Sequence, residues 1–274
     1  MSNVLVEKIG LERIASAIRN KNGLVSTYTP SQMASAINAL EKSGFSVDDV
    51  ADRSIVGNLS GKASFIRDYA FYNCSSLITV KFTNCTRIGN SAFYNCTALT
   101  TANFSSCSSI TAYAFQYCSA LTTVSFPACT NIAFSAFAYC RSLISANFPN
   151  CTYIESSAFN CCYSLTTANF PSCPIVGAYA FNYCYSLTTA NFPKCDSIGA
   201  SAFASCYNLI SLYLNHVFSV TTLAGTSVFY STPIGGRTTS TGGVYGSVFV
   251  PSSLLTSFKT ATNWASISAR IVGV

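Results

Sequence analysis

Ionisable side chains are scarce in this sequence. Only 9% of its 274 residues are charged, His216 is the single histidine, and Asp and Glu together number nine. Acid–base and metal-dependent catalysis need clusters of such groups, so we expect no enzyme, no cofactor and no metal site. No apolar run approaches the ~20 residues of a membrane-spanning helix, which argues against membrane insertion. The first residues also lack the apolar core of a secretory signal peptide.

Charge of one sign is not concentrated anywhere along the chain. The formal net charge is +6, but Lys and Arg are scattered, whereas nucleic-acid-binding proteins collect basic residues on one face. Nucleic acid is therefore not an expected partner. Disorder is excluded because half of the residues are hydrophobic and 14% are aromatic, and disordered chains are poor in both.

The sequence does contain a repeat of 22 residues. Phenylalanine recurs at this period in seven copies: Phe71, Phe93, Phe115, Phe137, Phe159, Phe181 and Phe203. Cysteine and leucine recur in phase with it, and a second Phe/Cys/Ile set lies half a period away. One such unit cannot bury its apolar residues alone, but stacked units cover each other. The sequence therefore predicts a solenoid of seven 22-residue coils spaced by ~4.8 Å.

Within a coil, the segment from Leu99 to Cys107 fits the leucine-rich pattern L-x-x-L-x-L-x-x-[NC]. We expect a strand over about residues 101–105, with Ala102 and Phe104 pointing inward. The other side of the coil, G-x-S-A-F-x-x-C, has room for a turn or two of helix. The predicted fold is therefore an α/β leucine-rich repeat solenoid over residues 54–215.

The repeat motif resembles a known family. I-[GT]-x-[SY]-A-F-x-x-C-x-[SA]-L-x-x-x-x-[FL]-P, seen in ITAYAFQYCSALTTVSFP, is similar to the BspA-like leucine-rich repeats of bacteria. The resemblance covers about residues 55–274, because Phe229 to Ile234 look like the family's closing segment; residues 216–274 are thus expected to be a C-terminal cap. Family members are mostly surface-exposed or secreted binding proteins, which implies a binding role at a cell surface.

The N-terminal residues follow another pattern. Apolar residues at helical spacing, followed by Thr29 and Pro30 as a helix start, predict a small helical hairpin over residues 1–40. A polar linker follows at 41–53. The pattern from Ile14 to Gly23 and from Pro30 to Ile37 resembles a module of tail-associated proteins of phages and prophages. That resemblance implies a place in a virion and contacts with other tail proteins through this module.

The cysteines have a structural and a chemical interpretation. Thirteen of the fourteen occupy the two repeat positions, and Cys161 is the exception. Zinc sites use C-x₂-C pairs, which the chain lacks, and neighbouring sulfurs of a stacked column have parallel Cβ vectors, which suit a disulfide poorly. We interpret the thiols as small buried hydrophobic groups.

Outward-facing positions supply the candidate ligand-binding residues. A Thr and Asn array on the strands includes Thr123, Asn147, Asn169 and Asn191, although strand preference and hydrogen bonds between coils also explain it. Tyrosines flank the first cysteine of several coils at positions that vary between otherwise similar units, as on recognition surfaces; they also could simply shield that side. The candidates are Tyr117, Tyr139 and Tyr183, which precede the cysteine, and Tyr163, Tyr185 and Tyr207, which follow it.

These observations favour a non-catalytic binding or structural protein. The leading interpretation is a phage or prophage tail-associated protein that recognises a protein or glycan on a host cell. The alternative is a bacterial cell-surface adhesin of the BspA-like family. The expected location is accordingly a virion or a cell surface, and assembly into a homo-oligomer is compatible with either interpretation.

Overall fold

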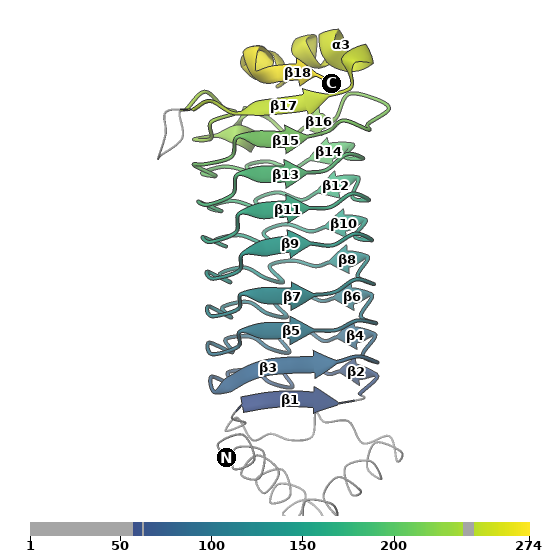
Figure 1. The fold of residues 1–274 in the computed structure, drawn as a ribbon, viewed down its shortest axis with the longest axis vertical. Coiled ribbons are helices and arrows are strands. Elements are labelled where there is room, and N and C mark those ends of the chain that lie inside the picture. Colours follow the sequence, from purple (N-terminus) through teal and green to yellow (C-terminus); the bar gives the residue numbers. More distant parts are fainter. Residues whose placement is uncertain (1–56, 62, 238–243) are drawn as a thin grey trace, which may run out of the picture.

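A computed structural model of the chain describes residues 57–61, 63–237 and 244–274. These residues form an elongated β-solenoid in which strands are stacked along the long axis in two columns that lie side by side (Figure 1). The predicted hairpin of residues 1–40 and the linker 41–53 lie outside the described residues. Within the described ranges, no helix is long and apolar enough to cross a bilayer.

The front column contains the longer strands. They are β1 (Gly57–Gly61), β3 (Leu77–Phe82), β5 (Thr101–Asn103), β7 (Thr123–Ser125), β9 (Ser145–Asn147), β11 (Thr167–Asn169), β13 (Thr189–Asn191), β15 (Ser211–Tyr213), β17 (Ser247–Val250) and β18 (Ile271–Gly273). All pair in parallel with equivalent residues opposite each other, for example Ala168 with Ala190. The column is interrupted between β7 and β9 and so forms sheets of four and six strands.

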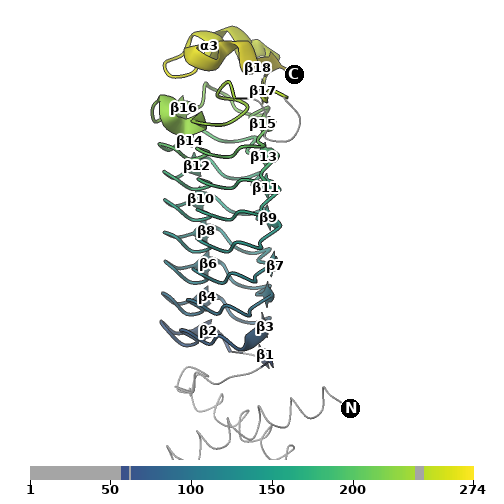
Figure 2. The same ribbon diagram turned by 90° about the vertical axis from the view of Figure 1, so that its left-hand side faces the viewer.

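The back column forms one continuous parallel sheet of eight two-residue strands. They are β2 (Phe65–Ile66), β4 (Arg87–Ile88), β6 (Ser109–Ile110), β8 (Asn131–Ile132), β10 (Tyr153–Ile154), β12 (Ile175–Val176), β14 (Ser197–Ile198) and β16 (Thr222–Leu223). Figure 2 shows the two columns side by side along the whole solenoid. The core lies between them.

The core consists of columns of identical side chains. The predicted inward residues Ala102 and Phe104 are both fully buried, which confirms the strand phase, although the strand ends at Asn103. Successive phenylalanine rings stack along the axis, as Phe115 does on Phe137 with ring centroids 5.2 Å apart. All fourteen cysteines are buried as free thiols. A typical one, the Cys118 thiol, donates a hydrogen bond to the carbonyl oxygen of Phe93.

The prediction of a helical turn or two on the other side of each coil is wrong, because that side consists of turns. Along it, N–H groups bond alternately within the coil and to the next coil: the Gln116 N–H donates to the Tyr113 oxygen at 3.1 Å, and the Tyr117 N–H donates to the Ala138 oxygen at 3.0 Å. In an α-helix, each backbone N–H donates a hydrogen bond to the carbonyl oxygen of the residue four positions earlier. On this side about every second N–H instead donates to a carbonyl oxygen of the next coil. These N–H groups are not available for an α-helix, so the fold has mostly strands and little helix.

Helices occur at the C-terminal end. They are the 3₁₀ helices η2 (Thr226–Phe229), η3 (Ser252–Leu254) and η4 (Ala265–Arg270) and the short α-helix α3 (Leu255–Thr260). Together with β17 and β18 they continue the solenoid beyond the seven predicted coils and lie over its last turn (Figure 1). Trp264 is fully buried beneath them, and its indole N–H donates to the Thr221 oxygen at 2.6 Å.

Candidate binding site

The turn side of the solenoid carries two residues per coil in the left-handed backbone region. The second of these positions has φ between 57° and 63° and is filled by Asn73, Asn95, Tyr117, Tyr139, Cys161, Tyr183 and Ser205. Asn tolerates this region, whereas a bulky side chain there is uncommon. The predicted Tyr117, Tyr139 and Tyr183 therefore occupy a conformation for which tyrosine is not the easiest residue.

The six predicted tyrosines form two short stacks along one edge, which we call the tyrosine edge. Tyr117 stacks on Tyr139 with ring centroids 4.7 Å apart. In the second stack, Tyr185 lies 4.8 Å from Tyr163 and 5.1 Å from Tyr207. Tyr183 joins this stack edge-on, 6.0 Å from Tyr185. The structure thus brings all six predicted tyrosines into one strip.

Cys161 connects the two stacks. It occupies the position that Tyr139 holds one coil earlier, and its thiol lies close enough to Tyr139 and Tyr163 for both to influence its pKa. Burial raises the pKa of the Cys161 thiol, and the hydrogen bonds from the two tyrosines act in the opposite direction. The exceptional cysteine of the sequence is therefore part of the tyrosine edge.

The stacked tyrosine rings cover much of each other's faces. Because neighbouring rings lie nearly parallel, at 13° between Tyr163 and Tyr185 and 5° between Tyr185 and Tyr207, they cover each other's faces. A sugar ring therefore cannot stack on the ring faces that lie between neighbours in a stack. Burial raises the pKa of Tyr163 and Tyr185.

Arginine lies at both ends of the second stack. The guanidinium of Arg141 lies 5.5 Å from the ring centre of Tyr163, and that of Arg237 lies 4.7 Å from the ring centre of Tyr207. Cation–π contacts of this kind hold a guanidinium while leaving its N–H groups available. Sequence reasoning missed both. The position of Arg141 could have been recognised from the sequence, because it lies 22 residues before Tyr163 and so in the same column. Arg237 lies outside the repeat, and no sequence pattern indicates its contact with Tyr207.

The predicted strand-face residues lie on the front column, away from the tyrosine edge. The Asn169 amide donates to the Asn147 oxygen at 2.8 Å, and the Asn191 amide donates to the Asn169 oxygen at 2.7 Å. Thr123 is exposed, and its hydroxyl lies 3.5 Å from that of Thr122. The amides therefore bond to each other, as the structural interpretation of this array expects, and fewer of their groups remain for a ligand.

Comparison with known proteins identifies the repeat. A model of the BspA type leucine rich repeat region matches residues 57–162 and 108–235 in six copies. The chain belongs to this family. A search of the curated proteins finds no significant match.

Solved structures share the fold of this BspA-type chain. A leucine rich cell surface protein from Faecalibacterium prausnitzii is 24% identical with a TM-score of 0.50, over 72% of this chain and 64% of that one. A leucine rich repeat protein of T. pallidum is 24% identical with a TM-score of 0.52, over 56% of this chain and 78% of that one. One from Bacteroides ovatus is 18% identical with a TM-score of 0.50, over 71% and 63%. The chain thus spans less than two thirds of the length of the Faecalibacterium prausnitzii and Bacteroides ovatus proteins.

Proposed function

We propose that this BspA-type chain is a non-catalytic binding protein of a cell surface, of the adhesin type, and that it holds its partner along the tyrosine edge. The observation that carries the proposal is the strip of tyrosines in two stacks, whose rings repeat at about the coil spacing on a backbone that stacking makes rigid. Rigid aromatic residues with two torsion angles lose little entropy when they bind a partner.

The backbone conformation supports a functional role for these tyrosines. An L-residue in the left-handed region costs roughly 1–2 kcal/mol, and the chain itself places Asn or Ser at the same position in other coils. The turn imposes this conformation in all seven coils, whichever residue is present, so a backbone preference does not explain the choice of tyrosine. Packing of the core does not require tyrosine here, because Ser205 fills the equivalent position in the last regular coil.

The non-catalytic part of the proposal rests on the scarcity of reactive groups. Within residues 63–237 and 244–274, no group of three or more His, Cys, Asp or Glu side chains is placed to hold a metal ion. The cysteines are buried, and burial raises the pKa of ladder thiols such as Cys129 to about 12. Nucleophilic chemistry needs the opposite shift.

Surface location is proposed because one structural relative is described as a cell surface protein. The tail-associated interpretation depended on residues 14–37, which the structure does not describe, and none of the comparisons supports it. The proposed function is therefore an adhesin-type role, with a protein or a glycan on a cell surface as the partner.

The test is a binding assay with the full chain on whole cells. After a screen of bacterial and animal cells for binding of the labelled protein, Tyr139, Tyr163, Tyr183 and Tyr185 are replaced together by Ser. The variant should fold, because Ser occurs naturally at both tyrosine positions, as Ser205 before the cysteine and Ser119 after it. Binding should fall at least tenfold, which needs a loss of only ~1.4 kcal/mol over four residues.

The matched control replaces Asn147, Asn169 and Asn191 by Lys on the front column. Its circular dichroism spectrum and that of the tyrosine variant should both match the parent protein. If the lysine variant loses binding while the serine variant keeps it, the partner binds the front column and the tyrosine edge is not the site.

A further inference from the structure

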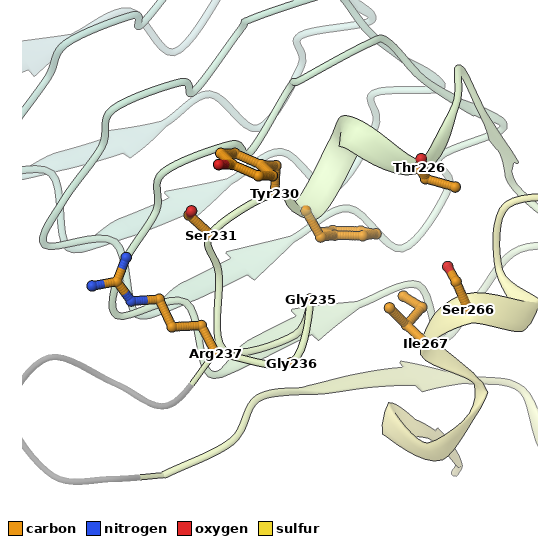
Figure 3. A pocket seen from close by; sticks show the side chains of 9 residues that line it. Thr226, Tyr230, Ser231, Gly235, Gly236, Arg237, Ser266 and Ile267 are labelled. Atoms are coloured by element: carbon orange, nitrogen blue, oxygen red, sulfur yellow. The ribbon is translucent and has the colours of Figure 1, made fainter.

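A hollow of about 470 Å³ lies at the C-terminal end of the tyrosine edge. In Figure 3, Tyr230, Ser231 and Arg237 lie on one side of it, and Thr226 on η2 and Ser266 and Ile267 on η4 lie on the other. The hollow is within the size range of small-ligand sites. Ile267 gives it an apolar surface, while the ring of Phe229 is only 3% exposed and packs on Phe203 and Trp264 beneath it. The other lining side chains carry hydroxyl groups, apart from one arginine.

The loop that carries Arg237 is held in one conformation. The Thr232 hydroxyl donates to the Phe229 oxygen at 2.7 Å and accepts from the Gly235 N–H at 2.9 Å, while the Arg237 N–H donates to the Thr232 oxygen at 3.0 Å. A Cβ on Gly235 would lie only 2.1 Å from the Phe229 oxygen, so the loop closes this tightly only with glycine. Ligand binding therefore requires little ordering of the loop.

Arg237 is the charged residue at the rim of the hollow, and its exposed guanidinium lies on the side away from Thr226 and Ser266 (Figure 3). Its guanidinium is held on the ring of Tyr207 and keeps planar N–H donors for an anion. No carboxylate lines the hollow. In the described part of the chain the acidic residues are Asp68, Glu155 and Asp196, none of them among the lining residues.

The second tyrosine stack begins beside the hollow, because Arg237 lines the hollow and also contacts the ring of Tyr207. Tyr207 connects Arg237 to Tyr185 and Tyr163, and Arg141 lies at the far end. A ligand that follows this path meets tyrosine rings whose centroids lie 4.8 and 5.1 Å apart, with a guanidinium at each end. Since the ring faces are covered, recognition is by hydrogen bonds, which suits a chain of polyhydroxylated units better than an apolar peptide.

We propose that the hollow binds the carboxylate-bearing terminal unit of an acidic oligosaccharide, with Arg237 paired to the carboxylate and the following sugar units placed along Tyr207 and Tyr185 towards Arg141. The apolar side chain of Ile267 faces the C–H groups of the terminal sugar, and Ser231, Thr226 and Ser266 supply hydroxyl partners. This inference rests on the proposed function and specifies the ligand class for the same edge.

The test is calorimetric titration of the full chain with four probes. Sialyllactose and trigalacturonate carry the carboxylate on different sugars, lactose is the neutral reference, and a tetraglutamate peptide supplies charge without sugar. We expect one or both acidic sugars to bind at least tenfold more tightly than lactose and tetraglutamate. The one that binds identifies the source of the carboxylate.

Four variants locate the binding. Arg237→Gln should lower affinity for the acidic sugar at least tenfold, and Arg237→Lys should lose most of that affinity because the planar pair of donors is gone. Ser266→Trp fills the hollow and should abolish binding. Arg270→Gln is the matched control, because Arg270 packs on Tyr245 at 3.8 Å in the same way but does not line the hollow; its affinity should equal that of the parent.

The inference fails if neither acidic sugar exceeds lactose, if tetraglutamate binds as well as the sugars, or if binding survives both Arg237→Gln and Ser266→Trp. The proposed function is judged separately by the cell-binding assay. Cell binding that is lost with the tyrosine variant, yet unaffected by Arg237→Gln and by enzymatic removal of acidic sugars from the cells, would mean a protein partner on the same edge.

Discussion

Replacing Phe126 by Ala tests how the core holds the coils together. Phe126 is 1% exposed and stacks on Phe104 at 5.3 Å and on Phe148 at 6.1 Å. It also meets Phe115 and Phe137 edge-on or nearly so, at 5.8 and 6.0 Å. Truncation removes the buried ring and leaves a cavity in a stack that cannot collapse, because the coils above and below set its height. We expect a loss of ~3–5 kcal/mol in unfolding free energy.

The assay is urea unfolding followed by circular dichroism, with the midpoint and slope compared between variants. Phe218→Ala is the matched control, since the same ring is deleted at a site that is 97% exposed. Thr123→Ala, on the outward face of β7, is the second. Surface changes of this kind lie within about ±0.5 kcal/mol. Equal losses at Phe126 and at either control would refute the burial assigned to these positions.

Three further outcomes are expected. Ellman titration of the native chain should detect few thiols, and nearly all fourteen after denaturation without reductant, whereas mostly oxidised sulfurs would contradict free buried cysteines. Stability should fall as pH rises above about 9, because burial raises the pKa of Cys107 and Cys129 from 9.0 to about 12 and only the unfolded chain releases these protons between the two values; a urea midpoint that is constant up to about pH 11 would exclude this linkage. Tyr139→Asn should be more stable than Tyr139→Ala by about 0.5–1 kcal/mol, because Asn tolerates the positive φ of this position; the opposite order in thermal unfolding would remove the argument from backbone strain.

Much of the core could be predicted because its period is visible in the sequence. Ala102 and Phe104 are buried as the alternation of a strand requires, and the cysteine columns pack as small hydrophobic groups. The helical side could not be predicted correctly from its small residues. The N–H groups of residues such as Phe115 and Tyr117 bond to the next coil, and a sequence pattern within one coil does not show where its N–H groups point.

The candidate site was predicted in the same partial way. The two tyrosine columns follow from residues that recur 22 positions apart, and their stacking follows from the coil spacing. Arg237 could not be found, because it reaches Tyr207 from a loop outside the repeat. The role of Cys161 was equally hidden, since only the stacked coils place its thiol between Tyr139 and Tyr163.

The sequence by itself determined the solenoid, its period, the inward columns and the residues of the tyrosine edge, because each coil repeats the same local burial problem and stacking is its shared solution. The tertiary structure alone decided which backbone groups bond between coils, that the tyrosine rings cover each other's faces, and that Arg237 and a hollow complete one end of the edge. Those features depend on contacts between coils and on a closing segment without repeats, which no periodic pattern encodes.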